Sequence, residues 1–431
     1  MGQKISCRLT GKAGGWAGPV AVLTMWTYCF MSTGVIKALG VMLPTLRDQF
    51  ETKSWVIGWI TSMVVAMSGF IGPFVGPLVR RFGASGVIMT CGAMLGLASI
   101  AGSFAIATYQ LALAYTLLAG AGLGMSDVIS KQVVGRCFDQ NHATAIGIAR
   151  TGASMGLFIS APVVQILLDA YGWRGTMLLM GAICSHMILC GALMHQYGSS
   201  KPRNEDYQEI QGVSDFSSAI HPANLLSSLC TIWKSFVVNL DLKLFLDIRF
   251  WLTAIIYCNS KFAIDMWKIY FVSSVVSRGF SLEDAAAFVA VGGVGSLVSK
   301  LAQGFIVDRG ILPCWAVMAI GLGCGTVSFC TTPWLKSYWS IMLLSSLLLM
   351  TGYGLTICID VAVKQMLGVD LLAGVYGWIG ILTTILRCTL GFLPGLMYDY
   401  SGSYNAPFFF LGCMCMPSLF SVLVLRYKQL V

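Results

Sequence analysis

Long apolar runs, separated by short polar and charged segments, dominate the chain from about residue 19 onward. A helical run of about 20 apolar residues matches the thickness of a bilayer. Gly and Pro recur inside these runs, as transmembrane helices tolerate. Twelve runs can be counted, near residues 19–43, 55–79, 85–106, 108–130, 143–168, 175–196, 250–276, 285–306, 313–333, 337–362, 372–397 and 405–426. The pattern predicts an all-α membrane protein with twelve transmembrane helices.

A polar segment near residues 197–249 separates the runs into two groups of six. From Leu225 to Leu246 this segment alternates apolar blocks with Lys234, Asp241 and Lys243. That part carries too much charge to cross a bilayer and indicates an amphipathic helix at the membrane surface. We therefore expect a cytoplasmic tail over 1–18, a six-helix half over 19–196, a cytoplasmic linker over 197–249, a second six-helix half over 250–426 and a cytoplasmic tail over 427–431.

One phrase, Asp-Val-x-x-Lys-Gln-x-x-Gly, occurs in both halves. It begins at Asp127 and returns at Asp360, 233 residues later, at the end of a glycine-containing apolar run each time. The duplication suggests two equivalent halves, as in transporters built from repeats. Asp127 with Lys131, and Asp360 with Lys364, can form pairs four residues apart at helix ends. Each pair is either a solvated helix terminus or part of a gate between the halves.

The composition narrows the class of protein. Hydrophobic residues make up 57% of the 431 positions and charged residues 10%, whereas a soluble domain carries about 25% charge. The net charge of +9 is therefore assigned to membrane loops and not to nucleic-acid binding. The 15 cysteines lie mostly in apolar runs without metal-ligand spacing, so we expect reduced core residues, no metal site and no cofactor.

Lys and Arg in the connections predict the orientation. With both termini in the cytoplasm, the short inside segments hold eleven of these residues and the outside loops hold five. That bias follows the positive-inside rule and predicts a multi-pass membrane protein with cytoplasmic termini. The first residues also fit a myristoylation pattern, with Gly2 as the acceptor and Cys7 available for a second acyl chain. The alternative is an ordinary cytoplasmic tail.

Two loops share a pattern of glycine and charge. Gly76-Pro77-Leu78-Val79-Arg80-Arg81-Phe82-Gly83 follows the second run, and Gly304-Phe305-Ile306-Val307-Asp308-Arg309-Gly310 follows the eighth. Both resemble the Gly-x-x-x-Asp-Arg loop signature of the major facilitator superfamily, although Arg80 replaces the acid in the first copy. Glycine at such a place lets two helices approach closely. The resemblance implies two six-helix halves that move against each other.

More specifically, the chain resembles the monocarboxylate transporter family over nearly its whole length. Ala13-Gly14-Gly15-Trp16-Ala17 is similar to the family's opening motif, without its acid and its second Trp. The fifth run keeps Phe138, Ala145, Gly147, Ala149 and Gly152 of the family's signature, without its basic cluster. The resemblance implies symport of a small organic anion across the plasma membrane. Some members of that family use a single-span glycoprotein partner, and the sequence leaves open whether this chain does.

Charged residues occur inside the predicted spans. Asp265 is the only acid well inside them, against six basic residues: Lys37, Arg150, Lys261, Lys268, Lys300 and Arg387. A charge at mid-bilayer costs roughly 2.5–3.5 kcal/mol even on a lenient insertion scale, so each of them calls for a partner or a cavity. The excess of cations favours an organic anion or a zwitterion as the substrate.

The resemblance assigns roles to three of these positions. Lys37 falls where the family has a lysine that meets the substrate carboxylate; the alternative is that its amine extends to the outer interface. Ser296 and Lys300 fall where proton-linked relatives carry an Asp and an Arg. The acid that would carry the proton is absent, and lysine lacks the bidentate fork of arginine. Proton coupling by that route is therefore in doubt.

Three further intramembrane charges have open roles. Asp265 either pairs with Lys261, four residues away on the same face, or neutralises Lys300 or Lys37 across a cavity. Arg387 is expected to face that cavity. Arg150 either faces the cavity as well or extends toward the interface, and its position two turns from the cytoplasmic end of its run favours the second.

These observations favour a secondary transporter that works by alternating access. A non-transporting membrane receptor or chaperone, acting through the 197–249 linker, is the alternative. An integral-membrane enzyme is not expected, because the four histidines are scattered and no nucleophile–base pair or nucleotide-binding loop is present in the sequence.

Overall fold

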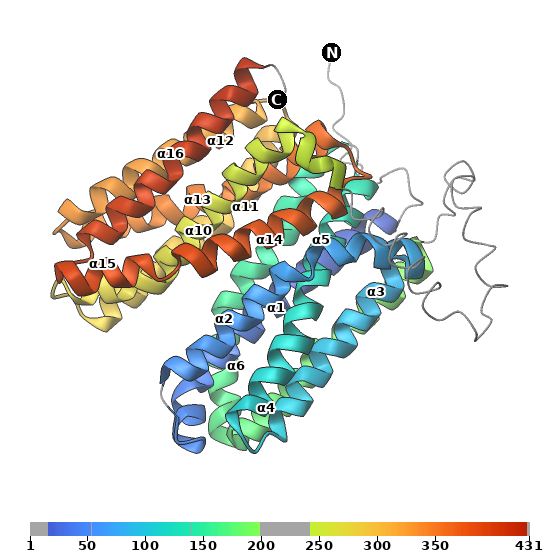
Figure 1. The fold of residues 1–431 in the computed structure, drawn as a ribbon, viewed down its shortest axis with the longest axis vertical. Helices are drawn as coiled ribbons and strands as arrows, with labels where there is room; N and C mark the ends of the chain where they lie inside the picture. Colours follow the sequence, from blue (N-terminus) through green and yellow to red (C-terminus); the bar gives the residue numbers. More distant parts are fainter. Residues whose placement is uncertain (1–15, 53, 139, 199–241, 429–431) are drawn as a thin grey trace, which may run out of the picture.

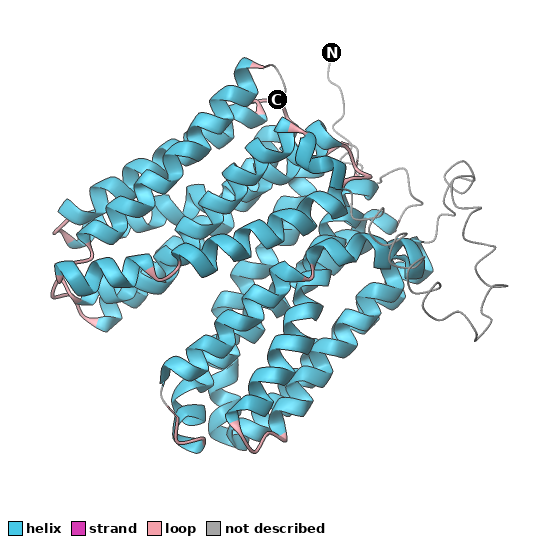
Figure 2. Cartoon of the chain, viewed as in Figure 1, coloured by secondary structure: helices cyan, strands magenta, loops and turns pink. Residues whose placement is uncertain are grey.

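The computed structural model describes residues 16–52, 54–138, 140–198 and 242–428. Within these residues the regular secondary structure is entirely helical (Figure 2). Gly2, Cys7 and almost all of the expected surface helix over 225–246 lie outside the described residues. The last part of that segment forms a 3-10 turn, η4, over Leu242–Leu246.

Two helical bundles make up the described structure (Figure 1). The first contains α1 Ala17–Gln49, α2 Ser54–Phe70, α3 Gly72–Ser103, α4 Thr108–Leu113, the π-helix η1 Ala114–Gly120, α5 Ala121–Cys137, α6 His142–Cys184 and α7 His186–Gly198. The second contains α10 Ile248–Val276, α11 Leu282–Asp308, α12 Cys314–Thr331, the 3-10 turn η5 Thr332–Trp334, α13 Tyr338–Leu367, α14 Leu372–Leu390, α15 Leu393–Ser401 and α16 Asn405–Tyr427.

Two glycines interrupt the longest helices. Gly83 within α3 has φ 73° and Gly172 within α6 has φ 66°, values that glycine adopts without strain. The expected boundaries between the second and third spans, and between the fifth and sixth, fall at or near these breaks. Eight described helices are long and apolar enough to cross a membrane, and Ile60–Phe70 and Tyr338–Leu348 are shorter apolar helices. The count of twelve spans stays a prediction.

The ends of several helices follow from local sequence. α11 begins with a capping box, in which the Ser281 hydroxyl accepts from the Asp284 backbone N–H and the Asp284 carboxylate accepts from the Ser281 backbone N–H. α6 begins after Asn141, whose φ of 59° is the left-handed conformation that Asn tolerates. α13 ends at Gly368, which has φ 81°. These signals separate one apolar run from the next.

The two bundles lie close together at one end and diverge toward the other (Figure 1). We call the first end the closed end; it holds the connections from α5 to α6, from α11 to α12 and from α13 to α14. The opposite, divergent end holds the connections from α1 to α2 and from α10 to α11. The bundles contact each other mainly in two places: α6 packs against α11, and α14 packs against both α2 and α3.

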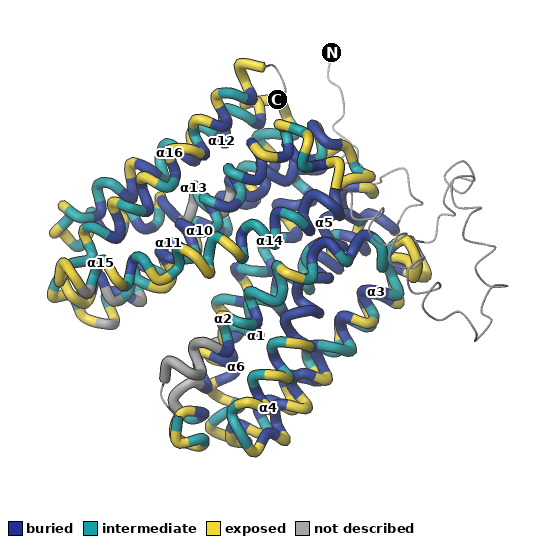
Figure 3. Tube along the Cα trace, in the orientation of Figure 1, coloured by how far each residue is buried: buried dark blue, intermediate teal, exposed yellow. Residues whose placement is uncertain are grey.

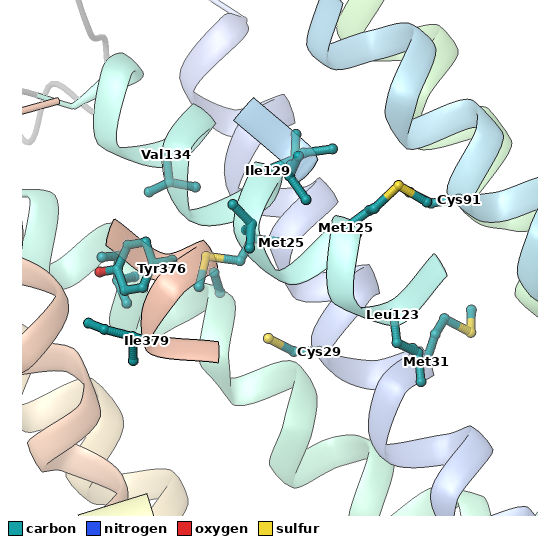
Figure 4. Packing of buried hydrophobic residues seen from close by; sticks show 14 of the residues in the cluster. Met25, Cys29, Met31, Cys91, Leu123, Met125, Ile129, Val134, Tyr376 and Ile379 are labelled. Carbon is teal, nitrogen blue, oxygen red and sulfur yellow. The ribbon is translucent and has the colours of Figure 1, made fainter. Parts of the chain in front are cut away.

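Apolar side chains face both the interior and the exterior of the bundles. Buried positions lie where helices face each other, and exposed positions lie along the outer surfaces (Figure 3). Exposed apolar residues include Leu117, Ile166, Leu343 and Phe420, as lipid contact requires. Near the closed end, residues of α1 and α5 pack close to Tyr376 and Ile379 of α14 (Figure 4). The core therefore crosses the boundary between the bundles.

Candidate functional site

Glycines bring the backbones of the two bundles together at the closed end. A Cβ atom added to Gly72 of α3 would lie 2.7 Å from the Gly377 Cα atom of α14. A Cβ atom on Gly304 of α11 would lie 2.7 Å from the Ala143 carbonyl oxygen of α6. Neither position has room for a larger residue unless the helices separate. Gly304, the glycine of the second loop signature, therefore lies at a contact between the two bundles.

The acid of that loop signature bonds to the other bundle. Asp308 at the end of α11 accepts hydrogen bonds from the Ala143 backbone N–H at 3.2 Å and the Thr144 backbone N–H at 2.6 Å. These N–H groups belong to the first turn of α6, where no helical partner exists and the helix dipole favours an anion. The contact can form only while the two bundles are together at the closed end.

The basic residues of the loop signatures lie nearer the surface. Arg80 and Arg81 are exposed, and the Arg81 guanidinium lies 5.4 Å from the centre of the Phe82 ring. Arg309 is exposed as well, with its guanidinium 4.0 Å from the centre of the Phe305 ring. Gly76 faces Ala373 of the opposite bundle, because an added Cβ would lie 3.9 Å from the Ala373 Cβ. Gly76, Gly304 and Asp308 of the two signatures therefore lie at contacts between the bundles.

A buried ion pair lies one layer deeper. Arg150 of α6 donates from Nε to Asp360 Oδ2 of α13 at 3.2 Å and also from Nη2 to the same oxygen. The side chain of Asp360 is 1% exposed and that of Arg150 is 16% exposed. The Tyr376 hydroxyl of α14 donates to the other carboxylate oxygen of Asp360 at 2.7 Å. The pair joins the two bundles, and both carboxylate oxygens of Asp360 have partners.

Two of our expectations were wrong here. Asp360 does not pair with Lys364, whose amine instead donates to the Phe138 carbonyl oxygen of the other bundle. Arg150 does not extend to the interface, because α6 and α13 lie close enough for its guanidinium to reach a carboxylate. A carboxylate inside the protein supplies the counter-charge and the hydrogen bonds that a buried guanidinium would otherwise take from water. The second copy of the repeated phrase therefore bonds across the bundles.

The first copy of the phrase keeps its internal pair. Lys131 donates to Asp127 at 2.6 Å within α5, and the Lys131 side chain is 3% exposed. Tyrosines of the opposite bundle cover the amine: Nζ lies 3.4 Å from the Tyr257 hydroxyl and 4.5 Å from the centre of the Tyr376 ring. Aromatic faces stabilise a desolvated cation at such distances. Lys131 therefore also contributes to the boundary between the bundles.

Asp265 of α10 lies in a second group of charges, nearer the divergent end. It pairs with Lys268 at 3.0 Å and with Arg387 of α14. The expected pairing with Lys261 was wrong: the helix places Lys268 within reach of one carboxylate oxygen, and α14 brings Arg387 to the other. Lys261 is half-buried and interacts with Asp265 electrostatically over a longer distance. We call Lys261, Asp265, Lys268 and Arg387 the Asp265 cluster.

The remaining expected site residues lie on three helices. Lys300 of α11 is buried and donates to the Ser154 hydroxyl of α6 at 2.7 Å. The Ser296 hydroxyl, one turn away, is buried with no described hydrogen-bond partner. Lys37 of α1 is exposed and lies within electrostatic range of Lys268 on the other bundle. Asp265 therefore neutralises neither Lys300 nor Lys37 by direct pairing.

Three contributors to this region were missed from the sequence. Tyr376, Tyr257 and Ser154 are hydroxyl-bearing residues within apolar runs. Each contacts a lysine of the other bundle: the Tyr376 ring and the Tyr257 hydroxyl contact Lys131, and the Ser154 hydroxyl accepts from Lys300. A hydroxyl group within a membrane span requires a hydrogen-bond partner. These residues could therefore have been singled out from the sequence as candidates for contact with the charged side chains. Among the described residues, no group of His, Cys, Asp and Glu could hold a metal ion.

The fold and this site define a class of protein: an integral membrane carrier with two helical bundles that are joined by buried charged residues. A family model described as Major Facilitator Superfamily matches residues 25–391. The chain therefore belongs to the major facilitator superfamily and is a multi-pass secondary transporter, not an enzyme.

Curated relatives narrow the family further. The chain is 27% identical to mouse monocarboxylate transporter 11 over 347 residues, which is 77% of this chain and 70% of that protein. It is 25% identical to human monocarboxylate transporter 11 over 94% of this chain and 82% of that protein. Rat monocarboxylate transporter 13 is 25% identical over 93% of this chain and 86% of that protein. The protein is thus a distant relative of the monocarboxylate transporters.

Solved structures of the superfamily have the same fold. The proton:xylose symporter XylE, bound to 6-bromo-6-deoxy-D-glucose, matches with a TM-score of 0.70 at 12% identity, over 96% of this chain and 95% of that one. The E. coli fucose:proton symporter FucP matches with a TM-score of 0.66 at 13% identity, over 94% of this chain and 98% of that one. At such low identity the similarity concerns the fold alone.

Proposed function

We propose that this protein carries a small organic anion, a monocarboxylate or a related acid, across the plasma membrane by alternating access. The single observation that carries the proposal is the Asp265 cluster, in which one carboxylate is shared by cations from two helices, α10 and α14. An excess of cationic side chains at membrane depth attracts an anionic substrate. Similarity to monocarboxylate transporters supports the same class.

The proposed topology is the one expected from the sequence. Twelve spans would form two halves, 19–196 and 250–426, with the 197–249 linker and both termini in the cytoplasm. The closed end would then face the cytoplasm and the divergent end the exterior. In this arrangement the substrate enters from outside and first meets Lys37, which is exposed on α1. Lys300, Ser296, Asp265 and Arg387 are the other proposed substrate-site residues.

The contacts at the closed end form the proposed inner gate. Arg150–Asp360, Lys364 with the Phe138 carbonyl, and Asp308 with the start of α6 must all break before that end can open. Lys261 and Lys300 both lie within electrostatic range of Arg150. A substrate carboxylate held beside these lysines competes with Asp360 for the guanidinium. Substrate binding therefore weakens the gate, which couples occupancy to opening.

Helix α11 offers no acid for proton coupling, because Ser296 and Lys300 occupy the positions where proton-linked relatives carry an Asp and an Arg. Asp265, the acid that remains, is held by two cations, which favours its ionised form. We therefore propose transport that depends little on a proton gradient. The alternative function is that of a receptor or chaperone that acts through the 197–249 linker. A single-span glycoprotein is also proposed as a partner.

Uptake into proteoliposomes tests the proposal. The full-length protein, supplied with labelled lactate, pyruvate and related small acids, is expected to accelerate uptake over protein-free vesicles, with less than a twofold change under an inward proton gradient. Lys37→Ala is expected to abolish this uptake, and Lys336→Ala on an exposed loop serves as the control. Absence of flux under any gradient would favour the receptor role. Strong proton acceleration would instead assign coupling to Asp265.

A further inference from the structure

We infer that His142 makes the contact between the bundles at the closed end depend on the pH of the cytoplasm. The imidazole is buried and uncharged while the bundles are together there, and it takes up a proton when they separate, so that acid favours the open form. The inference rests on the proposed function in one respect: the closed end faces the cytoplasm and opens during transport.

His142 lies between two contacts that join the bundles at the closed end. It is the first residue of α6, directly before the apolar run, and it is 6% exposed. The backbone N–H groups of the next two residues donate to the Asp308 carboxylate of α11. Four residues before His142, the Phe138 carbonyl oxygen accepts from the Lys364 amine of α13. Separation of the bundles breaks the contact on each side of His142 in the chain and admits water to the ring.

The surroundings of the imidazole ring favour its neutral form. The Nδ1 atom is buried and has no hydrogen-bond partner among the described residues. On the side of α5 the ring faces bare backbone, because an added Cβ atom on Gly135 would lie 3.9 Å from the His142 Cε1 atom. An imidazolium donates from both ring nitrogens, so the charged form would bury an N–H group that has no acceptor. The closed end therefore disfavours a proton on His142.

Charged groups of the second bundle face His142 from two helices. On α13, the Lys364 amine repels a positive imidazole and the Asp360 carboxylate attracts it. Both oxygens of Asp360 already accept hydrogen bonds from other side chains. On α11, both oxygens of Asp308 accept from the N–H groups that directly follow His142. The two carboxylates are thus already bonded to donors other than the imidazole.

The first bundle does not supply a counter-charge in its described residues. On α5, the cation Arg136 is largely exposed and lies 3.9 Å from Asp370. α1, which also packs against α6, carries no charged residue between Ala17 and Ile36. Within α6, the first charged side chain after His142 is that of Arg150, about two turns away, and it is also a cation. A proton on His142 would therefore add positive charge to a region without a free carboxylate.

The sign of the pH dependence follows from this difference between the closed and the open form. Burial, and after it the Lys364 amine, lowers the pKa of His142 to about 4 at the closed end. In contact with water the pKa returns toward the ordinary histidine value of about 6.5. The closed form is thus stabilised above about pH 6.5 and loses this stabilisation as the pH falls toward 4. Between about pH 7.5 and about pH 6.0 the ratio of open to closed molecules rises about fourfold.

The proton enters and leaves on the same side of the membrane. His142 precedes the apolar run of α6, at the end that is proposed to face the cytoplasm, whether the bundles are together or apart. Its titration therefore changes how often that end opens and carries no proton across the bilayer. This agrees with the small effect proposed for a proton gradient directed inward.

Hydrogen–deuterium exchange of the full-length protein in lipid nanodiscs tests the inference without a substrate. The readout is the protection of the Ala143 and Thr144 backbone N–H groups, which donate to Asp308 only while the bundles are together. Protection is the intrinsic exchange rate divided by the measured rate at the same pH, so the direct effect of pH on exchange cancels. In the parent protein it is expected to fall about fourfold from about pH 7.5 to about pH 6.0. Protection that does not change would overturn the inference.

His142→Gln separates the imidazole from other groups that titrate, such as Asp308. Its protection is expected to change by less than about 1.5-fold over the same pH range, because glutamine does not titrate. His195→Gln, at an exposed position near the end of α7, is the matched control and is expected to keep the fourfold change. A His142→Gln protein that also keeps the fourfold change would contradict the inference.

His142→Lys provides a second test, because its charge is present at both pH values. Its protection is expected to be lower than that of the parent already at about pH 7.5 and to fall no further at about pH 6.0. Protection equal to that of the parent at both values would count against the inference. Transport is measured separately: a protein with the expected exchange response that takes up none of the small acids would reject the proposed function and leave the pH-dependent closure in place.

Discussion

The two copies of the repeated phrase occupy one helix in each bundle, α5 and α13, and make different bonds. In α5, Asp127 and Lys131 pair with each other. In α13, Asp360 and Lys364 both bond to the first bundle, through Arg150 and the Phe138 carbonyl oxygen. The difference arises because α6 offers an arginine beside Asp360, whereas aromatic rings of α10 and α14 surround Lys131. Duplicated sequence thus specifies equivalent positions, while the opposing bundle decides the partners.

The comparison predicts that the second copy contributes more to closing the bundles than the first. Asp360 is almost fully buried and bridges the bundles, whereas Asp127 is one-third exposed and bonds within its own helix. Four substitutions rank these contributions. The readouts are the unfolding midpoint in detergent and the rate of substrate uptake.

The largest effect is expected for Asp360→Asn. It leaves the Arg150 guanidinium buried without a counter-charge, which costs about 3–5 kcal/mol. The unfolding midpoint should fall strongly and uptake should be nearly lost. Asp169→Asn on the exposed part of α6 is the control. The double variant Arg150→Leu, Asp360→Leu should recover part of the stability; a single variant as stable as the parent would show that the pair does not hold the bundles together.

Tyr376→Phe should have the next largest effect. It removes the hydrogen bond to Asp360 and keeps the ring that lies against Lys131. A hydrogen bond to a charged group contributes about 1.5–3 kcal/mol, so a clear but smaller loss of stability is expected. Combining Tyr376→Phe with Asp360→Asn should add little, because both changes affect the same contact. Additive losses in the double variant would mean that the hydroxyl acts elsewhere.

Asp127→Asn should destabilise less, by about 1 kcal/mol. The amide oxygen of asparagine can still accept from the Lys131 amine, and the rings of Tyr257 and Tyr376 remain in place. The unfolding midpoint of this variant should lie between that of the parent and that of Tyr376→Phe. A loss as large as that of Asp360→Asn would remove the difference between the two copies.

The smallest effect is expected for Arg136→Gln. Its guanidinium lies 3.9 Å from the Asp370 carboxylate, and both side chains are largely exposed. Exposed pairs of this kind contribute about 0–1 kcal/mol and are screened by salt. Stability and uptake should therefore match the parent within experimental error at physiological ionic strength. A marked loss of uptake would place this surface pair among the contacts of the gate.

Much of the architecture could be predicted from the sequence. Runs of apolar residues indicated membrane helices because a bilayer cannot satisfy exposed backbone groups. The matching loop glycines indicated close helix contacts, and Gly304 does lie against Ala143 of the other bundle. Superfamily membership followed from the same motifs. The expected span boundaries near Gly83 and Gly172 coincide with kinks inside longer helices. The positive φ of each glycine changes the direction of the chain at that point.

The partners of the charged residues could not be predicted in the same way. Spacing of four residues suggested Asp360–Lys364 and Lys261–Asp265, and the structure has neither pair. Arg150 and Arg387 take those carboxylates from other helices. Pairing within a helix gains little free energy, about 0.2–0.5 kcal/mol. A carboxylate that is buried between bundles loses far more if it lacks a full set of donors, so the contact across helices is preferred.

The sequence by itself determined the class of this protein: a helical membrane carrier that repeats one phrase and is rich in intramembrane cations. These properties depend on local composition, on periodicity and on motifs that need no knowledge of neighbours. Only the tertiary structure decided that Arg150, Asp360 and Tyr376 meet, that Asp265 lies between Lys268 and Arg387, and that the bundles are closed at one end. Electrostatic partners depend on distances between helices far apart in the chain, and helix packing alone sets those distances.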